Sequence, residues 1–308
     1  MSAAQLSSAP DAAASPKQGP SPAAALLKFL RRNPKIIVGG LFILLLLAIS
    51  SIGPYFVDLK DARPMSVMPD TPPSFEKREL WLGSDAQGRS LLALLVAGIP
   101  LTLRIGLLAG AIGLGIGVIL GFVSGYVGGK TDLVIRTTAD IMLTVPGLLV
   151  LIVIAASIRG LVSITTIGLV VASLAWMWPT RTIRAQVLSL RERPYVEMAK
   201  LNGMGTGGII FKELIPNLLP FLGASFVGAV GSAVLAAIGL EALGLGPQQE
   251  PTLGMTIYWA IKYAAILNGL WWWWAVPVAA IVVLFVGLFL MAAGLDEIAN
   301  PRLRKANS

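Results

Sequence analysis

The sequence predicts an all-α integral membrane protein with six transmembrane helices. Of its 308 residues, 56% are hydrophobic and only 13% are charged, and the mean hydropathy is +0.78. A soluble domain carries about 25% charged residues, so too little polar surface remains here to coat a water-exposed globule. The chain also has no Cys and no His. We therefore expect no metal centre built on those ligands, no disulfide and no His-dependent catalytic site.

Six uncharged runs are long enough to cross a bilayer, because a helix needs about 20 apolar residues for that. In chain order they cover residues 36–57, 105–129, 141–158, 160–180, 214–240 and 263–295. We expect the second span to begin near Ile99 and the third near Leu133, with Arg136 and Asp140 in its first turns. Only Arg159 separates the third run from the fourth, so five spans plus one re-entrant segment is the alternative.

Positive charge predicts the orientation, because Lys and Arg accumulate in cytoplasmic segments. With the N-terminus inside, the inner segments hold 16 Lys and Arg and the outer segments hold 7, so both termini are predicted to be cytoplasmic. The net charge of +8 then reports orientation, and we expect no nucleic acid partner. The predicted division is a disordered tail (1–30), a first transmembrane helix (31–57), an extracytoplasmic loop (58–98), a five-helix core (99–296) with an inner loop (181–217), and a cytoplasmic tail (297–308).

Glycines recur every four residues in the second span, which places them on one helical face. They are Gly113, Gly117, Gly121 and Gly125. Small residues at this spacing let another helix backbone approach closely, so helix packing is predicted. The sequence leaves open whether the packed helix belongs to this chain or to another subunit.

The chain shows no energy source of its own. Residues 128–131 read Gly-Gly-Lys-Thr, like the end of a phosphate-binding loop, but Ser124 stands where that pattern needs a glycine. ATP is therefore expected to bind another polypeptide. The uncharged runs offer no Asp or Glu for proton or sodium coupling, and no nucleophile–base pair at membrane depth. These observations disfavour a membrane enzyme, and they leave a secondary transporter or channel as an alternative.

The inner loop carries the most informative pattern. A helix is predicted to start at Pro194 and stop at Gly203, and a second short helix to end at Pro216. By composition alone, this helix pair is either a docking element for a soluble partner or a solvated connector.

The inner loop resembles the EAA loop of ABC importer permeases. The resemblance lies in Glu197-Met198-Ala199, in Gly203 four residues after Ala199, and in Pro216 thirteen residues after Gly203. It implies that Glu197, Met198, Ala199, Gly203 and Pro216 belong to a coupling helix that inserts into an ATPase subunit. Met198, Glu213 and Ile215 depart from the usual residues, outside the Glu, Ala, Gly and Pro frame.

Four further segments resemble the C-type subunit of the dipeptide/oligopeptide/nickel permease family. They are residues 81–90 (WLGSDAQGRS), 125–132 (GYVGGKTD), 239–246 (GLEALGLG) and 294–304 (GLDEIANPRLR). This resemblance implies a type I ABC importer permease fold in a bacterial inner membrane. It also implies a heterodimer with a second, related permease, two ABC ATPase subunits that bind ATP and Mg²⁺, and an extracytoplasmic solute-binding protein. The chain itself would hold no cofactor and no catalytic residue.

The resemblance implies short peptides as the substrate, with oligosaccharides as the alternative and nickel disfavoured by the lack of His and Cys. On the outer side, Gly83, Asp85, Gly88 and Arg89 form either a structured turn or a lip that meets the binding protein. The run Trp271 to Trp274 is expected to lie in an aromatic belt at the membrane interface, in contact with lipid.

Overall fold

The computed structural model describes residues 33–299, and within them the fold is all-helical apart from one isolated bridge between Ser84 and Ser90. The α-helices are α2 (Pro34–Ile52), α3 (Leu91–Val127), α4 (Gly129–Thr144), α5 (Gly147–Ser157), α6 (Ile164–Ala175), α7 (Met177–Arg191), α8 (Pro194–Leu201), α9 (Thr206–Gly208), α10 (Ile215–Ala242), α11 (Leu253–Lys262) and α12 (Trp271–Ala299). Short 3₁₀ turns are η1 (Gly53–Tyr55), η2 (Leu59–Ala62) and η3 (Arg78–Leu80), and η4 (Ile209–Leu214) is a π-helix. The tail expected at 1–30 lies outside the described residues, and so does the tail expected at 297–308 except for residues 297–299, which belong to α12.

Length and hydropathy support a membrane protein. Among the described residues, four helices are long and apolar enough to cross a bilayer, and their bounds are Pro34–Tyr55, Leu91–Val127, Thr206–Ala242 and Trp271–Ile298. The bent pair α4–α5 makes a fifth if it counts as one span. At 1.5 Å per residue, the 12 residues of α6 reach only about 18 Å, short of a core about 30 Å thick. The membrane class is confirmed, and six spans stay a prediction.

The third span is broken, which the sequence analysis missed. Helices α4 and α5 meet at 85° across a break at Val145 and Pro146. Pro146 has no backbone N–H, and its ring disfavours helical geometry for the preceding residue. Val145 accordingly has an extended backbone, with φ −83° and ψ 132°. Proline therefore ends α4 and starts α5 in a new direction.

The second span begins earlier than the expected Ile99. Helix α3 starts at Leu91, where the Ser90 hydroxyl accepts the Ala93 N–H at 3.3 Å and caps the helix. The loop that precedes α3 therefore ends at residue 90 in the structure, and its location outside the cell stays a prediction. Pro100 lies inside α3 without ending it.

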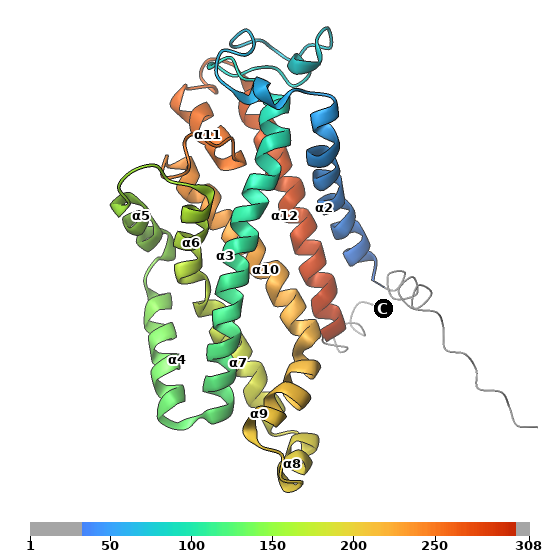
Figure 1. Cartoon of the computed structure of the whole chain (residues 1–308), viewed down its shortest axis with the longest axis vertical. Helices are drawn as coiled ribbons and strands as arrows, with labels where there is room; N and C mark the ends of the chain where they lie inside the picture. Colours follow the sequence, from blue (N-terminus) through green and yellow to red (C-terminus); the bar gives the residue numbers. More distant parts are fainter. Residues whose placement is uncertain (1–32, 300–308) are drawn as a thin grey trace, which may run out of the picture.

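Helix α3 forms the centre of the bundle and packs against α6, α7 and α10 (Figure 1). Helices α2 and α12 pack side by side, because Gly39 has no side chain to hold them apart: a Cβ there would lie 2.6 Å from the Gly287 carbonyl oxygen. The bundle has two ends. We call the end formed by residues 53–90 and α11 the loop end, and the end formed by α8 and α9 the α8 end (Figure 1).

Candidate functional site

Helix α8 projects from the α8 end and rests on the bundle through two apolar side chains. Val196 is fully buried and Ala199 is 7% exposed, and both join a cluster formed with α3, α7, η4 and α10. The opposite face holds the exposed Glu197, Met198 and Leu201, of which Met198 is 58% and Leu201 76% exposed. Three of the expected coupling residues are thus split between the buried face (Ala199) and the free face (Glu197 and Met198), and Gly203 follows the end of the helix.

Gly203 ends α8 as predicted. Its φ of +78° is a left-handed conformation that side chains with a Cβ rarely adopt. The Met204 N–H donates to the Ala199 carbonyl at 3.0 Å, and the Gly203 N–H to the Lys200 carbonyl at 3.0 Å. These bonds satisfy the last carbonyls of the helix.

The second short helix does not end at Pro216, and that prediction was wrong. The helical path runs without interruption from Thr206 to Ala242, and Pro216 lies in the first turn of α10. The π-helix η4 explains this, because the Ile215 N–H donates to the Ile210 carbonyl, five residues back. Because of this wider turn, the helix continues into α10 although Pro216 has no backbone N–H to donate.

The four glycines that line one face of α3 pack against helices of this same chain. A Cβ at Gly113 would clash with Ala175 at the end of α6, and one at Gly117 would lie 2.5 Å from the Pro179 Cβ. Gly121 and Gly125 likewise face Ile183 and Val187 of α7. The stripe therefore brings the α3 and α7 backbones together.

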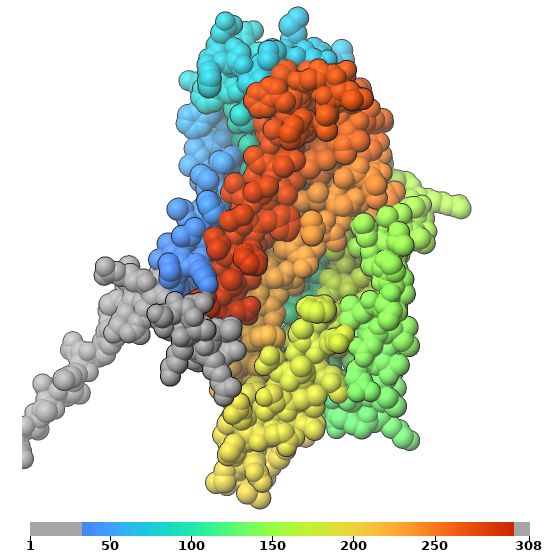
Figure 2. All heavy atoms as spheres, turned by 180° about the vertical axis from the view of Figure 1, so that it is seen from behind, coloured from blue at the N-terminus to red at the C-terminus, as the bar shows by residue number. Residues whose placement is uncertain are grey.

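A long groove opens between the helices on the far side of α3. Its cavity has a volume of about 1010 Å³ and is bordered by α4, α5, α6, α7, α10 and α12. Figure 2 shows this face, with α4 and α5 along one side of the hollow and α10 and α12 along the other. Its walls are mostly apolar, and the polar lining side chains are Thr182, Gln186, Ser225, Ser232 and Asp296.

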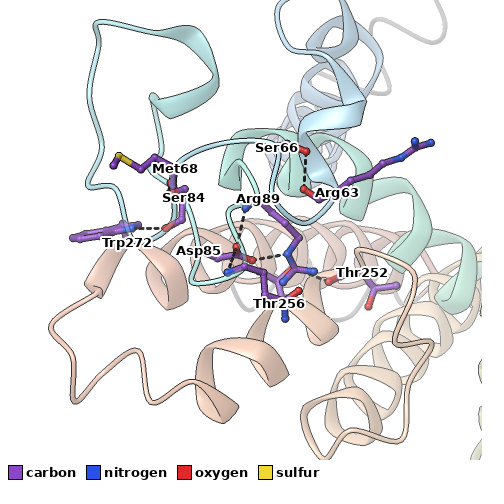
Figure 3. A network of polar contacts seen from close by, with 10 residues as sticks. Arg63, Ser66, Met68, Ser84, Asp85, Arg89, Thr252, Thr256 and Trp272 are labelled. Carbon is purple, nitrogen blue, oxygen red and sulfur yellow. Dashed lines mark hydrogen bonds and ion pairs between the residues drawn. The ribbon is translucent and has the colours of Figure 1, made fainter.

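A buried ion pair organises the loop end (Figure 3). The Arg89 Nε lies 2.6 Å from Asp85 Oδ2, and the side chains are 8% and 0% exposed. Burial raises the pKa of the Asp85 carboxyl above its usual range, although the Arg89 charge opposes that shift. The Asp85 Oδ1 also accepts the backbone N–H groups of Gln87 and Arg89, each at 2.9 Å. The pair therefore fixes a tight turn.

The structure places Gly83, Asp85, Gly88 and Arg89 inside this turn, where all four are buried. Gly83 and Gly88 have φ of +80° and +70°, which glycine alone adopts easily. The arrangement is a structured turn, and contact of these residues with a binding protein stays a prediction. Of the tryptophan run, Trp272 and Trp273 are buried, and Trp272 Nε1 donates to the Ser84 carbonyl at 3.1 Å. Only Trp271 and Trp274 are exposed enough for an interface belt.

The sequence analysis also missed helix α11 and the buried Glu241 that faces it. The Thr252 hydroxyl accepts the Met255 N–H at 3.1 Å and caps α11, and this threonine before an apolar run was the available signal. Glu241 is 0% exposed, and a side chain at Gly254 would clash with its carboxylate. Among the described residues, that carboxylate has no hydrogen-bond partner.

The residues that resemble a phosphate-binding loop lie at the junction of two helices. Gly128, with φ of +71°, separates α3 from α4, and Gly129, with φ of +60°, begins α4 together with Lys130 and Thr131. Within residues 33–299, no group of three or more Asp and Glu side chains could hold a metal ion.

Together, the apolar spans, the groove and the projecting helix define a multi-pass membrane protein of the permease class. The family model described as "Binding-protein-dependent transport system inner membrane component" matches residues 117–305. The chain belongs to that family, and the family supports a multi-pass protein of the inner membrane.

Curated relatives match along nearly the whole chain. The di/tripeptide transport system permease protein of Pseudomonas aeruginosa (strain UCBPP-PA14) is 31% identical over 292 residues, which cover 93% of this chain and 94% of the relative. The dipeptide transport system permease protein of Bacillus subtilis (strain 168) is 30% identical over 277 residues, covering 90% and 84%. The oligopeptide transport system permease protein of the same organism is 29% identical over 282 residues, covering 91% and 90%.

Proposed function

We propose that this chain is a non-catalytic permease subunit of an ATP-driven ABC importer that takes up short peptides delivered by a solute-binding protein. The observation that carries the proposal is the pairing of an open groove along the bundle with a projecting helix at one end. The printed names of the relatives, which are oligopeptide, di/tripeptide and dipeptide permeases, support peptides as the substrate.

The groove is half of the translocation pathway in this proposal. A second, related permease faces it and closes the other side, so that the two form a heterodimer. The walls are mostly apolar with a few hydroxyl and amide groups, and Asp296 is the one charged residue among those that line the cavity. Such walls contact peptide side chains of many kinds without holding any of them tightly, as a conduit requires.

Helix α8 is the coupling element in this proposal. Its exposed face, with Glu197, Met198 and Leu201, docks on one of two ATPase subunits, which bind the ATP and Mg²⁺. Its buried face, with Val196 and Ala199, transmits the movement to α3, α7 and α10. ATP drives transport only if the ATPases bind the inward- and outward-facing states with different affinity.

The orientation follows from the distribution of Lys and Arg. The α8 end and both termini are cytoplasmic, and the loop end faces outward, toward the binding protein. The buried Gly83, Asp85, Gly88 and Arg89 support the docking surface from within. Exposed side chains such as Met65 and Phe75, which are 90% and 88% exposed, make the contact itself.

The test is peptide uptake by the complete importer in proteoliposomes. The variant that combines Met198→Asp with Leu201→Asp places two charges on the free face of α8 and leaves the buried anchor intact. We expect it to lose the ATPase subunits on purification and to abolish ATP-dependent uptake of a labelled tripeptide. Leu267→Asp changes a side chain that is 88% exposed at the opposite end, and should keep the ATPases bound. Full uptake by the double variant would contradict the proposal.

A further inference from the structure

Three arginines meet in a small pocket between α4 and α7. The pocket has a volume of about 170 Å³ and is lined by Arg136, Ala139, Asp140, Thr180, Arg181 and Arg184. It is separate from the long groove and shares no lining residue with it. The proposed transport function gives this pocket no role.

The arginines are not all neutralised by their neighbours. Arg184 makes a two-point ion pair with Asp132, in which its Nε and Nη2 lie 2.5 and 2.6 Å from the two carboxylate oxygens. Arg181 Nη1 lies 3.8 Å from Asp140 Oδ1, too far for a hydrogen bond. Arg136 is exposed and has no ion-pair partner within the part of the chain that the structure describes. Arg136 and Arg181 therefore keep donors available for an anion.

The pocket lies near the charged end of the apolar helices α2 and α12. Lys35 at the start of α2 pairs with Glu297 near the end of α12, so charged groups mark the limit of the apolar spans there. In Figure 1 the middle of α4 lies at about the height of that end of α12. Beside the arginine, Leu133 and Val134 of α4 are 55% and 64% exposed. Arginines next to exposed apolar side chains on one helix are typical of the lipid headgroup region.

We propose that this pocket binds the phosphate of an anionic phospholipid in the leaflet at the α8 end. Guanidinium groups bind phosphate oxygens in pairs, with charge-assisted hydrogen bonds. Basic pockets between transmembrane helices bind acidic headgroups in this way. A water occupies about 30 Å³ in the liquid, so a pocket of about 170 Å³ accommodates a phosphodiester. Asp140 shares the pocket, but three arginines against Asp132 and Asp140 leave an excess of positive charge.

The bound lipid would join α4 to α7 through the guanidinium donors of Arg136 and Arg181 that make no hydrogen bond within the described residues. This inference goes beyond the proposed transport function. It requires only that the α8 end lies at a membrane surface, so that failure to import peptides would not affect it.

Native mass spectrometry of the full-length chain, delipidated in mild detergent with any subunits that remain bound, tests the proposal. The probes are dioctanoyl phosphatidylglycerol, dioctanoyl phosphatidylcholine and inorganic phosphate. We expect the anionic phosphatidylglycerol to bind more tightly than the zwitterionic phosphatidylcholine. Arg136→Gln and Arg181→Gln should each weaken its binding roughly fivefold, the contribution of one basic residue near an acidic membrane surface.

Two further variants serve as controls. Arg136→Lys keeps the charge but loses the planar guanidinium, so its binding should fall between that of the parent and that of Arg136→Gln. Arg159→Gln removes an exposed arginine outside the pocket and should change nothing. Arg136 makes no ion pair among the described residues, so its replacement leaves the fold intact, which gel filtration checks. Equal binding of the two lipids, or an unchanged preference in both glutamine variants, overturns the proposal. Binding of inorganic phosphate as tight as that of phosphatidylglycerol also overturns it, because the site would then be one for a free anion.

Discussion

The loop end and the α8 end of this bundle are held by different forces. At the loop end, the Asp85–Arg89 pair is buried, and backbone bonds tie Met65, Ser66 and Val67 to the turn at 2.8 to 3.0 Å. At the α8 end, no side-chain hydrogen bond or ion pair of the described residues ties α8 to the rest of the bundle. Apolar contacts of Val196 and Ala199 hold the helix, together with the Lys200 ammonium 5.8 Å from the centre of the Tyr126 ring. The loop end is thus a fixed platform, whereas α8 can shift without breaking a buried polar contact.

The largest effect is expected at the loop end, from breaking the buried pair. Asp85→Ala leaves the Arg89 charge buried without its partner, which costs about 3–5 kcal/mol of unfolding free energy. Denaturation of the detergent-solubilised chain, followed by tryptophan fluorescence, measures it. The double variant Asp85→Leu with Arg89→Met removes both charges and should recover most of the loss. A single variant as stable as the parent would show that the platform does not depend on the pair.

The next largest effect is expected where α3 packs against α7. Gly117→Ala places a Cβ 2.5 Å from the Pro179 Cβ, an atom of a rigid ring, and 3.1 Å from the backbone nitrogen of Thr180. We expect a loss of about 1–3 kcal/mol from overpacking. Gly115→Ala, on the same helix, meets nothing within 4 Å and should be neutral or stabilising by up to about 1 kcal/mol. Equal effects of the two variants in the same denaturation experiment would contradict the packing of α3 on α7.

A smaller effect on stability, with a large effect on transport, is expected at the end of α8. Gly203→Ala must hold a φ of +78° and costs about 1–2 kcal/mol locally. In Gly203→Ala, backbone amide hydrogen exchange of residues 194–214 should speed up while the membrane spans stay protected. The stronger change Gly203→Pro should abolish ATP-coupled uptake and leave membrane insertion intact. Gly205→Ala, where φ is already −69°, is the matched control. Normal uptake by Gly203→Pro would show that Gly203 is not part of the coupling element.

The smallest effect is expected at Pro216. The π-helix before it already bypasses the missing donor, and proline in a first helical turn costs little. Pro216→Ala should therefore change the unfolding free energy by less than about 0.5 kcal/mol. A larger loss would mean that proline itself sets the wide turn.

The sequence was sufficient for the class of fold, because apolar run length and charge asymmetry act locally along the chain. It was also sufficient for the end of α8, because Gly203 is a local stop signal. It could not give the 85° bend at Pro146, since a proline in a span either kinks or ends a helix according to its packing. Nor could it give the burial of Asp85 and Arg89, which depends on contacts with distant segments such as α11 and Trp272.

The central claim is that the free face of α8 contacts an ATPase subunit inside the cell. The chain has no cysteine, so Met198→Cys creates a unique site for a photoactivatable crosslinker, and Leu267→Cys creates the matched site at the loop end. The most direct measurement is crosslinking in native membranes, with mass spectrometry of the product. We predict that residue 198 crosslinks to a P-loop ATPase and that residue 267 does not. Crosslinking of the ATPase from residue 267, or from neither site, would contradict the account.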